Sequence, residues 1–187
     1  ATKPRLEERF AGHPGVGTLN ALDWMRYGSI QMPDGEDLTF AEDRAVIDWL
    51  NAHVAGSPVI AEASIGPYRC NGSRISINTG LPTIIGWERH ETQQRYLDGL
   101  VERVEDVRDL YASPDPEVKL AILRRYDVRY VVVGQLERFY PVIDQNDCVP
   151  TNPTAGIAAF DTMIGRSLEV AFQSGTTIVY RVLPPGA

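Results

Sequence analysis

The chain has 187 residues, of which 43% are hydrophobic, and this length suffices for one buried core. Its 18 basic and 25 acidic residues give a formal charge of -7, and no segment gathers the cationic stripe that a nucleic acid backbone requires. No apolar run approaches the roughly 20 residues of a transmembrane helix. We therefore expect a single soluble domain over residues 1–187 that does not bind nucleic acid.

A helix followed by a buried strand is predicted over residues 38–63. Thr39 and Glu42 form a capping-box pattern at the start of the helix, and Gly56 is expected to end it. The sequence PVIAEA, residues 58–63, then predicts a short buried strand. The apolar positions at helical spacing in this segment are Val46, Trp49, Leu50 and Val54.

A long amphipathic helix is predicted to begin near the end of residues 77–95. Apolar residues recur there at helical intervals, and they are Leu97, Leu100, Val101, Val104, Val107, Leu110 and Tyr111.

A second helix followed by a buried strand is predicted from residue 113 to residue 134. Ser113 or Asp115 caps the helix, and a proline occupies its first turn. The run RYVVVG, residues 129–134, is typical of a strand that is covered on both faces. The residues expected to fill the buried side of the helix are Val118, Ala121, Ile122 and Leu123.

The C-terminal part predicts a β-hairpin, because LEVAFQSGTTIVYRV, residues 168–182, alternates apolar and polar residues around Ser174 and Gly175. We interpret the polar residues 135–153 as a long loop. Two helix-to-strand units and a hairpin predict the fold class: an α/β, three-layer, Rossmann-like domain with a mostly parallel mixed sheet and a C-terminal β-hairpin.

Glu62 is the first candidate site residue, since it ends a predicted strand at the carboxyl edge of the sheet, where ligands bind in open α/β folds. Tyr68 follows closely and could stack on a ligand and hydrogen-bond to it. An equally weighted alternative is that Glu62 accepts a hydrogen bond from a neighbouring loop amide.

Residues 77–95, INTGLPTIIGWERHETQQR, are the second candidate. Trp87 with His90, Glu91 and Arg95 could form an aromatic platform beside charged groups, as sugars and phosphorylated ligands require. The alternative is structural, because Glu91 and Arg95 lie one helical turn apart and can form an ordinary salt bridge.

We predict that Trp87, His90 and Glu91 lie near Glu62, with a cation from His90, Arg89 or Arg95 between the carboxylates. No residue pattern indicates a catalytic nucleophile, a metal site or a cofactor.

Cys70 and Cys148 lie in separate polar, turn-rich segments. Free surface thiols and a disulfide between the two are about equally weighted, and neither cysteine has a second Cys or His at metal-ligand spacing.

Several of these segments occur together, and in one order, in a known family. They are an EA strand, the segments TGLPT, GW and HE, an R-x-x-D segment and a YVVVG strand. With these segments the chain resembles the DUF2298 or YYY family of polytopic membrane proteins over residues 18–182. The matching positions are Glu62, 79–83, Gly86, Trp87, His90, Glu91, Arg103, Asp106 or Asp109, Tyr111, 130–134, Glu137 and Arg138. The sequence departs from the family pattern at Gln93, where a tryptophan is frequent, and in TLNALDW near Thr18.

The resemblance implies an extracytoplasmic domain whose first partner is the transmembrane portion of the same protein. That portion is similar to the GT-C glycosyltransferases, which take a sugar from a polyprenyl-phosphate donor and carry their catalytic carboxylates in the membrane part. The resemblance thus implies a domain that is inactive alone, that contacts a lipid-linked sugar or glycan acceptor, and whose compartment permits the Cys70–Cys148 disulfide. The alternative is a structural or interaction domain without a ligand.

Overall fold

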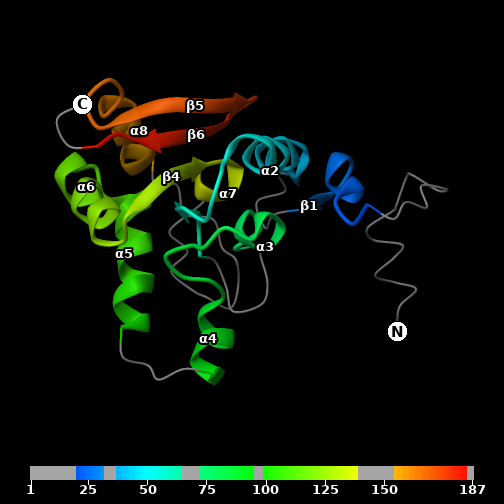
Figure 1. Cartoon of the computed structure of the whole chain (residues 1–187), viewed down its shortest axis with the longest axis horizontal. Helices are drawn as coiled ribbons and strands as arrows, with labels where there is room; N and C mark the ends of the chain where they lie inside the picture. The colour runs from blue at the N-terminus through cyan, green and yellow to red at the C-terminus, as the bar shows by residue number, and fades with distance from the viewer. Residues whose placement is uncertain (1–19, 32–36, 65–71, 95–98, 139–153, 185–187) are drawn as a thin grey trace.

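The computed structural model describes residues 20–31, 37–64, 72–94, 99–138 and 154–184 (Figure 1). The elements in chain order are η1 (Asp23–Arg26), β1 (Ser29–Gln31), β2 (Asp37–Thr39), α2 (Ala41–His53), β3 (Val59–Ala61), α3 (Ser76–Thr79), α4 (Glu88–Gln94), α5 (Leu100–Ala112), α6 (Pro116–Arg125), β4 (Val128–Val133), α7 (Gln135–Arg138), α8 (Thr154–Thr162), β5 (Leu168–Ser174) and β6 (Thr177–Val182). None of these helices is both long and apolar enough to cross a bilayer.

The main sheet has four strands in the order β3-β4-β6-β5, and β1 and β2 form a separate antiparallel pair. β3 and β4 are parallel, whereas β6 is antiparallel to both β4 and β5. The predicted α/β class, mixed sheet and C-terminal hairpin are confirmed. The prediction of a mostly parallel sheet is wrong, because β6 pairs with β4 as well as with its hairpin partner.

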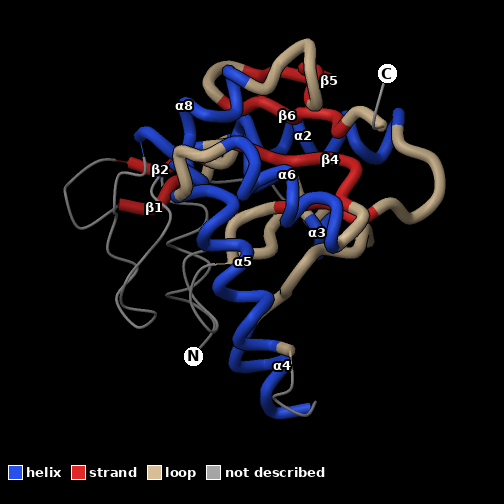
Figure 2. The backbone as a smooth tube through the Cα atoms, turned by 90° about the vertical axis from the view of Figure 1, so that its left-hand side faces the viewer, coloured by secondary structure: helices blue, strands red, loops and turns tan. Residues whose placement is uncertain are grey.

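Helices cover both faces of this sheet (Figure 2). Trp49 of α2 stacks on Phe172 of β5, with ring centroids 5.4 Å apart. Phe160 of α8 stacks on Tyr180 of β6 at 5.8 Å. Phe172 is opposite Val179 in the register, and Val179 and Tyr180 are consecutive, so the two aromatic pairs lie on opposite faces. The predicted three-layer arrangement follows, with α2 on one face and α5, α6 and α8 on the other.

The predicted capping box at α2 is wrong. The helix begins after Phe40 without a side-chain cap, and Thr39 belongs to β2. The Glu42 carboxylate instead accepts hydrogen bonds from the backbone amides and hydroxyls of Thr176 and Thr177, at 2.8 to 3.2 Å. Gly175 in the hairpin turn has φ of 56°, a left-handed conformation that favours glycine.

The start of α6 agrees with the sequence, whereas its buried side differs. Asp115 accepts a hydrogen bond from the Glu117 amide at 2.9 Å, and Pro116 is the first helical residue, so the Asp115 alternative is confirmed. Ile122 and Leu123 are buried as predicted, but Val118 and Ala121 are exposed. The third buried position is Lys119, whose aliphatic stem fills an apolar site.

The predicted long helix is divided into α4 and α5. Gly99 precedes α5 with φ of 81°, a left-handed conformation that interrupts a helix. Val101, expected on the buried side, is 59% exposed. Residues 135–138 form α7 rather than a loop, and residues 139–153 lie outside the described part of the chain.

Candidate functional site

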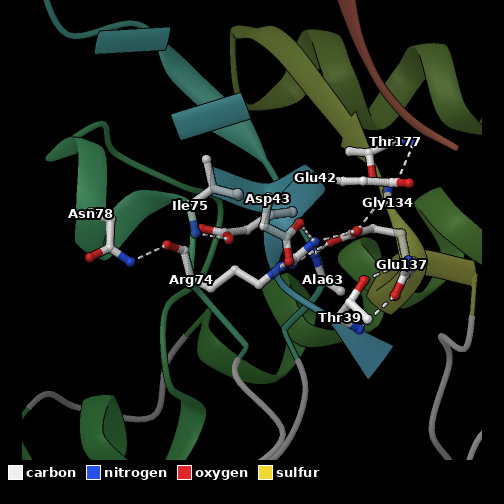
Figure 3. Close-up of polar contacts among 12 residues, drawn as sticks. Thr39, Glu42, Asp43, Ala63, Arg74, Ile75, Asn78, Gly134, Glu137 and Thr177 are labelled. Carbon is white, nitrogen blue, oxygen red and sulfur yellow. Dashed lines mark hydrogen bonds and ion pairs between the residues drawn. The ribbon is translucent and has the colours of Figure 1, made fainter. Parts of the chain in front are cut away.

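Charged side chains from four parts of the chain meet beyond the carboxyl ends of β3 and β4 (Figure 3). Glu62 follows β3, Glu137 lies in α7 just after β4, Asp43 is in the first turn of α2, and Arg74 precedes α3. We call these four residues the charged cluster. Each of them is at most 3% exposed.

Arg74 is the centre of the charged cluster. Its Nε and Nη2 donate to the Asp43 carboxylate at 2.6 and 2.8 Å, and its Nη1 and Nη2 donate to the Glu137 carboxylate at 2.9 Å each. Burial alone would lower the pKa of Arg74, but Asp43 and Glu137 raise it well above its usual value. The guanidinium is therefore a fixed positive charge between two carboxylates.

Glu137 also ties the two strand ends together. Its carboxylate accepts hydrogen bonds from the amides of Ala63, after β3, and Gly134, after β4, at 2.9 Å each. Burial raises the pKa of Glu137, but Arg74 and these bonds outweigh it, so the pKa is lowered overall. For Asp43 the balance is reversed, and burial raises its pKa despite Arg74.

Glu62 caps loop amides, as the structural alternative predicted. Its two carboxylate oxygens accept from the backbone amides of Ile75 and Ser76 at 2.8 Å each, and the side chain is 0% exposed. Burial raises its pKa in spite of Arg74 and these hydrogen bonds. The Glu62 carboxylate thus faces the interior.

The polar atoms of the charged cluster are hydrogen-bonded within the protein. In the described part of the chain, no buried side-chain nitrogen or oxygen of these four residues lacks a hydrogen-bond partner. The same part of the chain holds no group of His, Cys, Asp and Glu that could bind a metal ion. A buried cluster of this kind holds the loops after β3 and β4 in place.

Trp87, His90 and Glu91 come together at the start of α4. The Trp87 indole donates to the Gly72 carbonyl at 2.9 Å, and its ring meets the exposed His90 ring edge-on, with centroids 6.4 Å apart. Glu91 Oε1 accepts from the Gly86 amide at 3.2 Å. That these side chains lie near Glu62, with a cation between or beside the carboxylates, stays a prediction.

Four other candidates, Tyr68, Cys70, Arg95 and Cys148, lie outside the described residues, as does the side chain of Arg89. The site roles of Tyr68 and Arg95 and the disulfide remain predictions.

A groove of about 600 Å³ lies beside the TGLPT segment, between α3 and the helices α4 and α5. The walls come from two parts of the chain: residues 76, 77, 80–84 and 86, and then Glu91, Gly99, Leu100 and Arg103. We call this pocket the α3–α5 groove. Trp87 is not among its lining residues.

One wall of the α3–α5 groove is fixed to the sheet. The Pro82 carbonyl accepts from the Ile60 amide at 2.8 Å, and Thr83 forms a parallel bridge with Ile60, so the TGLPT segment runs beside β3. The Thr83 hydroxyl is buried and has no hydrogen-bond partner among the described residues.

Arg103 was not predicted as a ligand-binding residue. It lines the α3–α5 groove from the first turn of α5, the helix that begins after Gly99. The sequence signal that could have indicated Arg103 is Gly99, which can end or start a helix, four residues ahead of the arginine of the R-x-x-D motif.

No protein-family model and no curated protein sequence matches the chain. Among solved structures, the chain is similar to the C-terminal globular domain of an oligosaccharyltransferase from Archaeoglobus fulgidus. The identity is 11%, the alignment covers 75% of this chain and 96% of that domain, and the TM-score is 0.46. A similarity of this size leaves the function to be argued from the residues of this chain, and the resemblance to the DUF2298 family rests on the sequence motifs alone.

Proposed function

We propose that this chain is a non-catalytic, extracytoplasmic domain of a larger membrane glycosyltransferase, and that its α3–α5 groove holds part of the glycan acceptor or of the lipid-linked sugar donor. The observation that carries the binding role is the α3–α5 groove itself, about 600 Å³ in volume and built on a wall that is hydrogen-bonded to β3. The membrane context rests on the motifs that resemble the DUF2298 family.

The lining of the α3–α5 groove suits a sugar. Ile77 and Pro82 supply exposed apolar surface for the C–H face of a ring, while Glu91 and Arg103 supply polar groups for its substituents. The volume lies within the range of roughly 300 to 1,000 Å³ that small-molecule pockets span.

The arrangement of carboxylates supports a binding role rather than a catalytic one. Asp43 and Glu62, whose pKa values are raised by burial, lie in the interior without access to the α3–α5 groove. Glu91 is the one carboxylate among the described groove residues, whereas acid–base chemistry at a glycosidic bond generally uses a pair.

The test is a titration of the 187-residue chain with a panel of oligosaccharides, followed by NMR of the backbone amides. We expect shifts at residues of the α3–α5 groove. Ile77→Trp, at an exposed position in the wall, should weaken binding by about tenfold or more without changing the melting temperature. Val118→Trp on α6 is the matched control, because Val118 is exposed and does not line the α3–α5 groove.

If none of the sugars moves the amides of the groove, the binding role is wrong. Equal losses in Ile77→Trp and Val118→Trp would mean that the sugar binds elsewhere.

A second candidate function is an interaction domain that docks on the membrane portion without a ligand. The observation that favours it is the exposure of Ile77 and Val101, 58% and 59%, at the α3–α5 groove and next to it. A photo-crosslinking amino acid at position 77 of the full-length protein would then react with the membrane portion, and the panel of sugars would not compete.

A further inference from the structure

Arg103 is held in the α3–α5 groove by two contacts. Its Nη1 donates to the Ile84 carbonyl at 2.8 Å, and its guanidinium lies 4.9 Å from the centre of the Tyr126 ring. A carbonyl and an aromatic face fix the position of the group but do not neutralise its charge. The guanidinium is therefore ordered before any ligand arrives.

Two carboxylates close to Arg103 in sequence, those of Glu102 and Asp106, are engaged by other residues. Asp106, one turn along α5, accepts from the Tyr126 hydroxyl at 2.6 Å and from Arg125 Nη1 at 2.9 Å. Glu102 also accepts from Arg125, at 2.8 Å. Among the residues that the structure describes, Arg103 forms no ion pair.

Glu91 is the other charged residue of the α3–α5 groove, and its Oε1 is bound to the Gly86 amide. A fixed carboxylate in the same groove disfavours a ligand that bears several separate anionic groups. The balance of charges thus fits a ligand with one anionic group placed at Arg103.

We infer that the ligand of the α3–α5 groove is a sugar bearing one anionic group, a phosphate or a carboxylate, which the guanidinium of Arg103 binds. The inference rests on the proposed binding function and narrows it to one class of sugar. The N–H groups of Arg103 that do not contact Ile84 match the oxygen atoms of either anion.

The experiment compares three matched probes, glucose, glucuronate and glucose 6-phosphate, by titration of the 187-residue chain at low and moderate salt. We expect at least one of the charged sugars to bind about tenfold tighter than glucose, since a charge-assisted hydrogen bond is worth on the order of 1.4 kcal/mol or more. The charged sugar that binds tighter identifies the source of the anion.

Three variants locate the effect. Arg103→Gln should remove the preference for the charged sugar, and Arg103→Lys should retain part of it. Arg108→Gln is the matched control, because Arg108 lies on the same helix, is exposed and is absent from the α3–α5 groove lining. Melting temperatures check that each variant folds.

The possible failures are distinguishable. Equal affinity for all three probes, with shifts in the groove, would overturn the inference and leave the binding function in place. A fourth titration uses inorganic phosphate, and phosphate that binds as tightly as glucose 6-phosphate would also overturn the inference, because the sugar would then contribute nothing. The absence of any shift in the α3–α5 groove would overturn both proposals.

Discussion

Arg74 has the largest expected effect on stability of any single side chain in the charged cluster. Replacing it with methionine leaves Asp43 and Glu137 facing each other in the interior without their shared cation. Removing one partner of a buried ion pair typically costs about 3–5 kcal/mol. We therefore expect Arg74→Met to lower the free energy of unfolding, measured by urea denaturation, by an amount in that range.

The matched control is Arg108→Met, which removes an exposed arginine whose nearest acidic partner, Asp109, lies 3.7 Å away. Exposed pairs contribute about 0–1 kcal/mol, so this variant should unfold at nearly the urea concentration of the unsubstituted chain. Equal losses in the two variants would contradict the role given to Arg74.

Lys119 links stability to pH. It is 0% exposed, its amine donates to the Leu110 carbonyl and lies 4.1 Å from the centre of the Phe160 ring, and burial lowers its pKa to about 7. Between this pKa and the usual value for lysine, the unfolded state binds a proton that the folded state does not. The contribution of Lys119 to stability therefore rises with pH through this window and is flat below it.

Lys119→Met should remove this dependence. The difference in unfolding free energy between the variant and the unsubstituted chain is expected to grow as the pH falls from about 10 to about 7, by up to about 1.4 kcal/mol per pH unit, and then to level off. Taking the difference cancels the contributions of Asp43 and Glu62, whose pKa values are also shifted. A pH-independent difference would contradict the lowered pKa of Lys119.

At the scale of elements, α8 packs against the last turn of α5 with no space for a side chain at Gly156. A Cβ there would lie 2.1 Å from the Tyr111 carbonyl oxygen and 2.5 Å from that of Ala112. Helix propensity alone would favour Gly156→Ala by about 1 kcal/mol. Because both neighbouring atoms are backbone, we expect the steric cost to exceed this gain and the variant to lose about 1–3 kcal/mol.

Chemical denaturation measures this loss, and Ala158→Ser, at an exposed position of the same helix, should change stability by no more than about 0.5 kcal/mol. A stabilised Gly156→Ala variant would show that α8 can move away from α5 at little cost.

The elements that the sequence predicted correctly are those set by local chemistry. Asp115 and Pro116 start a helix through their own backbone, and alternation around Gly175 gives the hairpin. Glu42 has the spacing of a capping box, yet its carboxylate binds the amides and hydroxyls of two threonines at the hairpin turn, which begin 134 residues further along the chain. Local spacing could not reveal that competing partner.

At the scale of the whole molecule, the sequence located the region of the α3–α5 groove but not its chemistry. Residues 77–95 do supply much of the groove wall, and Glu91 is the charged residue among them. The four members of the charged cluster lie as far apart as residues 43 and 137, so their association depends on strand order, which residue types do not disclose. The position of Glu62 at a strand end is typical of a ligand site, and the sequence alone does not show that its carboxylate is buried against two loop amides.

The membrane context gives a prediction about the complete coding sequence. If the motif resemblance is correct, that sequence encodes several apolar segments of about 20 residues in addition to the domain described. A hydropathy profile of the complete coding sequence tests this directly. A profile without such segments would contradict the membrane context and would leave the binding role of the α3–α5 groove untouched.

The position of β6 has a consequence for synthesis on the ribosome. β6, residues Thr177–Val182, lies between β4 and β5, so the edge of β4 stays without its partner until residues 177–182 have emerged. That edge belongs to Val131, Val132 and Val133, which are at most 1% exposed in the folded chain. A nascent or truncated chain that stops before residue 177 would expose the unpaired edge of this valine strand. We expect such a chain to bind chaperones or to aggregate.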